Sequence, residues 1–172
     1  MGLLPADRTT RSSVFSKVGV DFAGLFLVHR CNPRTPTRVK VYVVVFVCLV
    51  TKAVYLDLCK DLSSESFIAA LSRFCGRRGV PLTLYSDNGT NFVGTRRELK
   101  EIRQMLHHPD TLKGLSHLAT TKGIDWKFSP PRAPHFGGLW DAAIKSMKSI
   151  LKKTVGPKPL SDEELRTVLV EA

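Results

Sequence analysis

The first third of the chain is dominated by closely spaced strand-like apolar segments. Residues 39–50 are almost continuously apolar and rich in β-branched side chains, which predicts a strand covered on both faces. Segments of similar character at 15–28 and 52–58 flank it, and a proline-containing turn at 31–37 separates the first two. Because the connections between these strands are short, we expect an antiparallel meander.

The spacing of apolar residues becomes helical after Ser63, which is a favourable N-cap, and the glycine and proline at 79 and 81 predict the end of that helix. The remaining expected elements are a strand at 82–85, helices at 93–106 and 111–121, a strand at 125–128, a proline-rich loop at 129–136, a helix at 138–154, and a last helix capped by Ser161. This order predicts an α/β fold with a five-stranded mixed sheet and helices on both faces.

Charge narrows the possible partners. The 172 residues contain 26 Lys and Arg but 15 Asp and Glu, giving a net charge of +11. Such a surplus favours a polyanionic partner, with nucleic acid first and an anionic membrane second. Charge alone also fits a basic protein that has no such partner.

The cysteines and the apolar segments indicate the compartment. Four scattered cysteines without a Cys-x-x-Cys pair suggest neither a disulfide framework nor a zinc site, which fits a reducing intracellular location, nuclear or cytoplasmic. The apolar segment at 41–50 is too short to cross a membrane, which takes about 20 residues. No signal peptide is visible at the N-terminus.

Three aspartates carry the candidate chemistry. Asp21 lies within an apolar strand, Asp87 begins a turn directly after a strand, and Asp141 follows two glycines at the start of a predicted helix. Three converging carboxylates would form a divalent-metal site suited to phosphoryl transfer. Each has an alternative. Asp21 could be paired or lie at the rim of the sheet, Asp87 is ordinary turn chemistry, and Asp141 would favour the helix dipole from the first turn.

The helix that contains Asp141 also has a polar stripe. Lys145, Lys148 and Lys152 follow Asp141 at intervals of about one helical turn, while its apolar face comprises Leu139, Trp140, Ala143, Ile144, Met147 and Ile150. An acid followed by lysines suits a metal ligand with phosphate-binding neighbours. It equally suits an Asp–Lys pair on a solvated face.

The motifs VGVDFAG, SDNGTNF and SPPRAPHFGGLWDAAIK resemble the integrase catalytic core of Pao/BEL-type LTR retrotransposons, from about Val18 to the end of the chain. The resemblance implies an RNase H-like fold in which Asp21, Asp87 and Asp141 hold two Mg²⁺ or Mn²⁺ ions. It implies DNA 3′-end processing and strand transfer as the reaction. It also implies a homo-oligomer that binds element ends and target DNA, without a membrane or a small-molecule cofactor.

Further site residues follow from the same resemblance. They are Thr90 and Asn91 at the target DNA, Lys145 and Lys148 at the element's DNA end, and Arg132 and His135 in the flexible active-site loop. The family pattern has glutamate at the position of Asp141. Because the aspartate side chain is shorter by one methylene, we expect weakened activity.

The implied domain organisation is an extended lead-in at 1–13 and an integrase-type core at 14–172 that stops within its last helix. The zinc-binding domain and the DNA-binding segment that flank such cores are not in this sequence, so we expect a fragment or a short product of a larger element. Two alternatives remain. One is a domesticated, non-catalytic nucleic-acid-binding or interaction module with the same fold, and the other is an RNase H-type hydrolase, which the integrase-like motifs disfavour.

Overall fold

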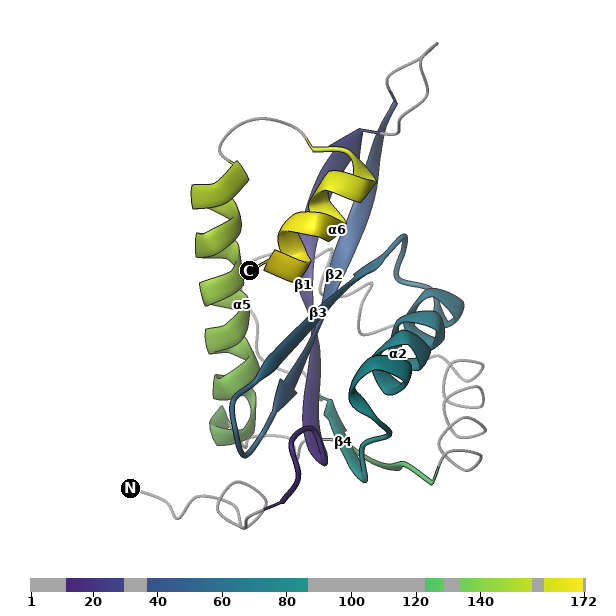
Figure 1. Ribbon diagram of the computed structural model, residues 1–172, viewed down its shortest axis with the longest axis vertical. Coiled ribbons are helices and arrows are strands. Elements are labelled where there is room, and N and C mark those ends of the chain that lie inside the picture. The colour runs from purple at the N-terminus through teal and green to yellow at the C-terminus, as the bar shows by residue number, and fades with distance from the viewer. Residues whose placement is uncertain (1–11, 30–36, 87–122, 129–133, 156–159, 172) are drawn as a thin grey trace.

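A five-stranded mixed sheet forms the centre of the protein (Figure 1). The computed structural model describes residues 12–29, 37–86, 123–128, 134–155 and 160–171. The sheet order is β3-β2-β1-β4-β5, and the bounds are β1 (Lys17–His29), β2 (Arg38–Cys48), β3 (Val54–Cys59), β4 (Thr83–Ser86) and β5 (Asp125–Phe128). The first three strands pair antiparallel, whereas β4 and β5 run parallel to β1. The predicted meander and mixed sheet are confirmed.

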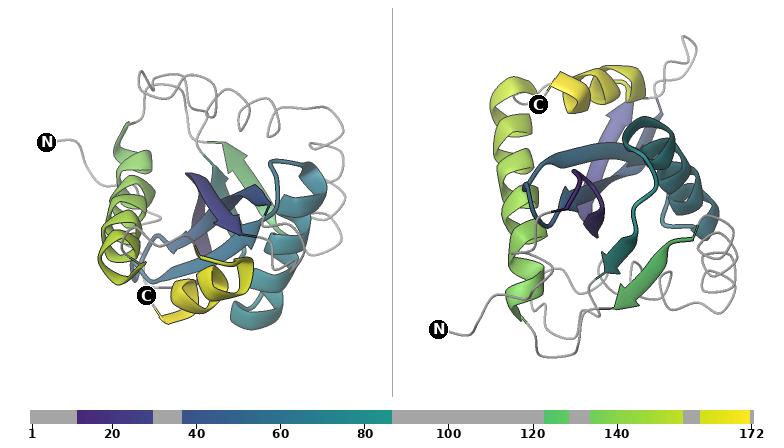
Figure 2. Two further views of the ribbon diagram at one scale, coloured as in Figure 1. Left: turned by 90° about the horizontal axis from the view of Figure 1, so that it is seen from above. Right: turned by 60° about the horizontal axis from the view of Figure 1, so that its bottom comes forward.

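Helices cover both faces of the sheet (Figure 2). The described helices are α2 (Ser64–Arg78), α5 (Pro134–Val155) and α6 (Asp162–Glu171). Residues of α2 pack on one face, and residues of α5 and α6 pack on the other. The helices expected at 93–106 and 111–121 lie outside the described residues.

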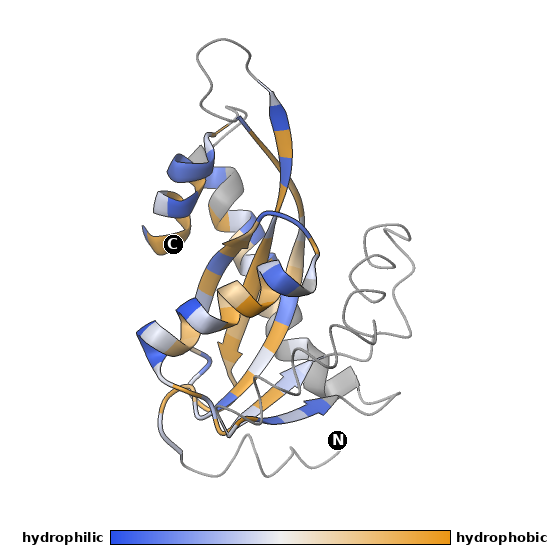
Figure 3. Ribbon diagram, turned by 90° about the vertical axis from the view of Figure 1, so that its right-hand side faces the viewer, coloured by the Kyte–Doolittle hydropathy of each residue, from blue (hydrophilic) through white to orange (hydrophobic). Residues whose placement is uncertain are grey.

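Strand β2 supplies both halves of the core. Val44 and Phe46 face α2, whereas Val43 and Val45 face α5 and α6, and all four are fully buried. A strand buried on both faces needs apolar residues at every position rather than at alternate ones. The continuous apolar run is therefore explained, and hydropathy colouring shows hydrophobic residues gathered on the strands at the centre of the protein (Figure 3).

Local signals set the helix ends as expected. The hydroxyl of Ser63 accepts a hydrogen bond from the backbone N–H of Ser66 at 3.2 Å, and Gly79 ends α2 with φ of 91°. At α6, Ser161 and Glu164 form a reciprocal capping box, with hydrogen bonds of 3.2 and 2.7 Å.

The start of α5 differs from the prediction. The helix begins at Pro134, so the segment expected as loop at 129–136 contributes its last residues, including His135, to the helix. Proline is favoured at the first position of a helix because its φ is already helical and the N–H that it lacks would have no partner there. Asp141 follows Pro134 by seven residues, and the alternative that placed it in the first turn is therefore wrong.

The apolar face of α5 is only partly buried. Met147 is buried and Ala143 and Ile144 are half-buried, but Ile150, on the same apolar face, is 38% exposed. Among the described residues, no helix is both long and apolar enough to cross a membrane.

Candidate metal and nucleic-acid site

Asp21 lies in the middle of β1, on the side of the sheet that α5 covers. Its neighbours Val20 and Phe22 belong to the core under α2, whereas Ala23 belongs to the core with Met147 of α5. Successive side chains of a strand point to opposite faces, so Asp21 shares the face of Ala23. The carboxylate is half-buried, and its Oδ1 accepts a hydrogen bond from the N–H of Phe22 at 2.7 Å.

The neighbouring strand leads to the second predicted carboxylate. Strand β4 runs parallel to β1, and its last residue, Ser86, pairs with Val20, the residue before Asp21. Ser86 is fully buried, and its hydroxyl accepts a hydrogen bond from the indole Nε1 of Trp126 on β5 at 3.1 Å. Asp87 follows Ser86 directly in the sequence but lies outside the described residues.

Helix α5 carries the third predicted carboxylate and two predicted lysines. The backbone of Asp141 is part of α5, and its side chain lies outside the described part of the structure. Lys145 and Lys148 are both exposed. The Nζ of Lys148 lies 3.7 Å from the position that a Cβ would take on Gly24, three residues along β1 from Asp21. The ammonium group of Lys148 thus lies beside the strand that carries the first carboxylate.

The other predicted site residues stay predictions. Thr90, Asn91 and Arg132 lie outside the described residues, and His135 is placed only by its backbone in α5. Among the described side chains, no three His, Cys, Asp or Glu residues gather where they could hold a metal ion. Two of the three predicted ligands, Asp87 and Asp141, are not among those side chains. The carboxylate oxygen that Asp21 contributes is the donor type that Mg²⁺ and Mn²⁺ prefer.

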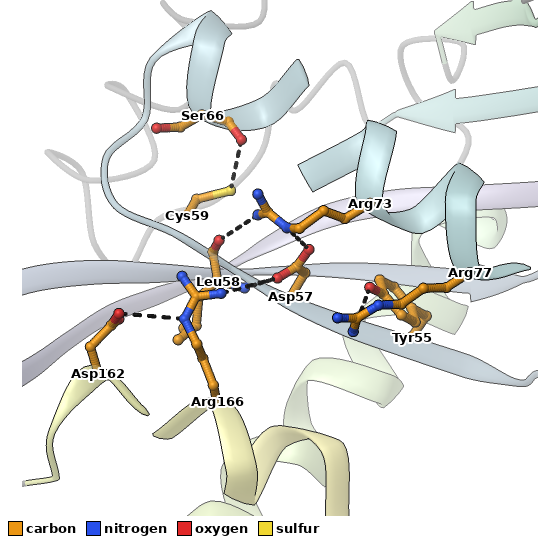
Figure 4. Close-up of polar contacts among 9 residues, drawn as sticks. All are labelled: Tyr55, Asp57, Leu58, Cys59, Ser66, Arg73, Arg77, Asp162 and Arg166. Carbon is orange, nitrogen blue, oxygen red and sulfur yellow. Dashed lines mark hydrogen bonds and ion pairs between the residues drawn. The ribbon is translucent and has the colours of Figure 1, made fainter. Parts of the chain in front are cut away.

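A second buried acid was missed by the sequence analysis. Asp57 on β3 is 8% exposed, and its Oδ2 lies 2.6 Å from the Nε of Arg73 on α2 (Figure 4). Its Oδ1 accepts a hydrogen bond from the N–H of Leu58 at 2.8 Å and lies 4.0 Å from Arg166 on α6. The sequence around Asp57 has the same pattern that identified Asp21, an acid between apolar strand residues. Because β2 separates β3 from β1, Asp57 belongs to a different site.

Comparison with known proteins identifies the fold. No family model and no curated protein matches the chain. Among solved structures, the catalytic core domain of BIV integrase is similar at a TM-score of 0.58 and 16% identity, over 91% of this chain and 82% of that one. The HTLV-2 integrase catalytic core domain, solved in complex with magnesium in a trimeric form, gives a TM-score of 0.55 and 18% identity, over 92% and 86%. The fold is that of a retroviral integrase core.

A third similar structure is larger than this chain. It is a chain of the simian T-cell lymphotropic virus intasome, solved in complex with the PP2A regulatory subunit B56 gamma, with a TM-score of 0.62 and 17% identity. The match covers 98% of this chain and 52% of that one, so this chain spans about half of that relative's length. The expected RNase H-like fold with a five-stranded mixed sheet is confirmed.

Proposed function

We propose that the chain is a retrotransposon-derived integrase core of the Pao/BEL type, which binds DNA and divalent metal and carries out 3′-end processing and strand transfer. The observation that carries the proposal is the position of Asp21. It lies on the sheet face covered by α5, in the strand next to β4, whose last residue is followed by Asp87. Asp141 belongs to the helix that covers this face.

Each carboxylate has a role in the proposal. Asp21 would contact both Mg²⁺ or Mn²⁺ ions, and Asp87 and Asp141 would each contact one. Bound ions of this kind activate water or a 3′-hydroxyl and stabilise the leaving oxygen in an in-line displacement. The ammonium group of Lys148, which lies near Gly24 of β1, would bind a DNA phosphate, and the exposed Lys145 lies one turn earlier on the same helix.

The remaining residues would guide the DNA. Thr90 and Asn91 would contact target DNA, and Arg132 would act from the segment that precedes α5. His135 would act from the first turn of α5 rather than from a loop. The assembly would be a homo-oligomer acting in the nucleus or the cytoplasm.

The aspartate at position 141 should limit the rate. Its carboxylate is withdrawn by about 1.5 Å relative to that of glutamate, the length of one carbon–carbon bond. A misplacement of about 1 Å can cost roughly 100-fold in rate. We therefore expect Asp141→Glu to raise Mg²⁺-dependent strand transfer between oligonucleotides by up to about 100-fold. Asp125→Glu, at an exposed position of β5, is the matched control and should change nothing.

Strand transfer also tests the reaction itself. Asp21→Asn and Asp87→Asn should abolish it with either metal. If Asp141→Glu brings no gain with Mg²⁺, the geometric argument is wrong. If activity survives Asp21→Asn, the assignment of the triad is wrong.

Metal binding separates the enzyme from a non-catalytic module with the same fold. Mn²⁺ at about 100 times its Kd should stabilise the folded chain by about 2.7 kcal/mol, measured as a rise in the thermal unfolding midpoint. Asp21→Asn should remove this rise, whereas Asp57→Asn, the same change on the edge strand β3, should retain it. No Mn²⁺ response in the unaltered chain would favour the module.

DNA binding is tested by its salt dependence. If Lys145 and Lys148 each neutralise a phosphate, replacing either with glutamine should reduce the slope of log affinity against log salt by about 1. Lys153→Gln, which alters another exposed lysine of α5, is the control. An unchanged slope in both test variants would contradict the phosphate contacts.

A further inference from the structure

The paired ends of β1 and β2 extend beyond the other strands of the sheet (Figure 1). Strand β4 pairs with β1 only at 17–20, and β3 pairs with β2 only from residue 42 onwards. Residues 26–29 of β1 and 38–41 of β2 therefore pair with each other and with no other strand of the sheet. We call these two segments the ribbon, and its two faces are covered differently.

The face of the ribbon towards α6 is buried. Val28 and Val39 belong to the core formed with α5 and α6, and Val28 is 1% exposed. The N–H of His29 donates to the carbonyl of Leu160 at 2.8 Å, in the segment that leads into α6. These contacts hold the ribbon from behind, so its other face is presented from a fixed support rather than from a loop.

The opposite face of the ribbon is open to solvent. Because side chains alternate along a strand, Leu27 and His29 of β1 share this face with Arg38 and Lys40 of β2. Leu27 lies directly opposite Lys40, and His29 lies directly opposite Arg38. Leu27 is 49% exposed, and both cations are exposed. Helix α2 covers the same side of the sheet at Tyr42, the next position along β2, but its cover ends there.

Nothing in the sequence of this region neutralises the two cations. Residues 22–56 contain five Arg and Lys but no Asp or Glu. The ion pairs found among the described residues involve Arg73, Lys127 and Arg166 instead. Cations without nearby acids on an open face attract a polyanion.

We propose that the open face of the ribbon binds duplex DNA in the major groove. That groove is about 12 Å wide and admits a two-stranded β-ribbon, and β-ribbon proteins read DNA in this way. Arg38 and Lys40 are separated by two strand residues, about 6.6 Å, which is close to the rise of two base-pair steps, about 6.8 Å. Both would bind phosphates along the groove, and Leu27 would pack on base edges beside them.

This surface is separate from the candidate metal site. Asp21 lies on the face of the sheet that α5 covers, whereas the open face of the ribbon lies on the side of α2. The inference rests on the DNA binding in the proposed function, but it requires neither metal nor catalysis. With both surfaces occupied, the chain would hold DNA on both sides of its sheet.

The chemistry of the open face favours duplex DNA over other polyanions. Single strands are held by stacking on aromatic side chains, and the exposed residues of this face include no Phe, Tyr or Trp. Duplex RNA has a deep, narrow major groove that side chains cannot read. An acidic protein would match the cations, but the single exposed leucine offers little of the apolar core that protein interfaces need.

Binding of a fluorescein-labelled DNA duplex, followed by fluorescence anisotropy at several salt concentrations, tests the cations. Arg38→Gln and Lys40→Gln should each reduce the slope of log affinity against log salt by about 1, and the double variant should bind about tenfold more weakly. Lys52→Gln, which alters an exposed lysine at the other end of β2, is the control and should change neither quantity. Because all three side chains are exposed, the thermal unfolding midpoint should stay the same.

A modified duplex tests the groove. Glucosylated 5-hydroxymethylcytosine fills the major groove and leaves the phosphates in place, so it should weaken binding by the unaltered chain by about tenfold. The Arg38→Gln/Lys40→Gln double variant should bind the modified and unmodified duplexes equally. Duplex RNA of the same sequence should compete at least about tenfold more weakly than duplex DNA.

The outcomes separate this inference from the proposed function. If Lys145→Gln and Lys148→Gln reduce the salt slope but Arg38→Gln and Lys40→Gln do not, the ribbon contact is wrong and the candidate site keeps its support. The reverse pattern keeps the ribbon contact and contradicts the phosphate contacts of α5. A chain that binds no DNA overturns both. Equal binding of the glucosylated duplex by the unaltered chain, or equal competition by duplex RNA or polyglutamate, would overturn binding in the DNA major groove.

Discussion

Replacing Arg73 with methionine should lower the free energy of unfolding by about 2 to 3 kcal/mol, because the buried carboxylate of Asp57 loses its closest cation. The Nε of Arg73 lies 2.6 Å from the Asp57 carboxylate, which is 8% exposed. A hydrogen bond to a charged group contributes about 1.5 to 3 kcal/mol, and breaking a fully buried pair costs about 3 to 5 kcal/mol. Arg73 is itself 37% exposed, so water can partly replace it, and the lower range applies.

Urea unfolding followed by circular dichroism measures this loss. Arg166→Met is the matched control, because Arg166 is 4.0 Å from Asp57 and 40% exposed, and its removal should cost less than about 1 kcal/mol. In an Asp57→Asn background, the cost of Arg73→Met should fall to about 1 kcal/mol, since no buried charge is then left unpaired. An equal cost in both backgrounds would refute the electrostatic explanation.

Three further predictions concern the core, the cap of α2 and the cysteines. Phe74→Ala should cost about 4 kcal/mol in urea unfolding, because the ring is fully buried and stacked at 4.5 Å on another phenylalanine. The hydrogen bond from the Ser63 side chain lowers the pKa of Asp61 below 3.8, so Asp61 adds stability above its unfolded pKa and loses it as pH falls through the lower folded pKa. Asp61→Asn should therefore destabilise the fold at pH 6, and the difference should disappear as the pH falls through the folded pKa of Asp61. Burial raises the pKa of the Cys59 thiol to about 12, and the other described cysteines, Cys48 and Cys75, are also buried. Cys31→Ser removes the remaining cysteine, so iodoacetamide at pH 8 should label this variant only after urea unfolds it.

The sheet was predictable because its central strand is unambiguous. A run of apolar, β-branched residues at 39–50 leaves no polar face, which requires cover on both sides, and the structure provides it with α2 on one side and α5 with α6 on the other. Capping residues then located the ends of α2 and α6, because a serine hydroxyl satisfies N–H groups that otherwise lack partners.

The beginning of α5 was not predictable by the same logic. The prolines at 130–134 predict a loop, because proline breaks the interior of a helix. At the first position of a helix, however, proline is favoured. Local sequence alone does not distinguish the two uses, since the choice depends on whether the following residues find a surface to pack on. Here Met147 and Ala143 pack against the sheet, which stabilises the helix as a whole.

The candidate site was only partly predictable. Sequence alone identified Asp21 as an acid within an apolar strand, yet the same pattern describes Asp57. The two aspartates differ in their tertiary contacts. Asp57 meets Arg73 from a distant helix, whereas Asp21 lies on the face of α5, beside the strand that ends one residue before Asp87. Only the pairing of strands and the arrangement of helices distinguish a structural acid from a candidate ligand.

The revised start of α5 also bears on residue 141. Asp141 is seven residues from Pro134 and fourteen from Val155, so its backbone lies well inside the helix rather than at its end. End residues fray, but interior ones are held by hydrogen bonds on both sides. A backbone in that position cannot shift at low cost to bring a shorter side chain closer to a metal. The longer helix therefore strengthens the expectation that Asp141→Glu, rather than a change in the preceding segment, increases activity.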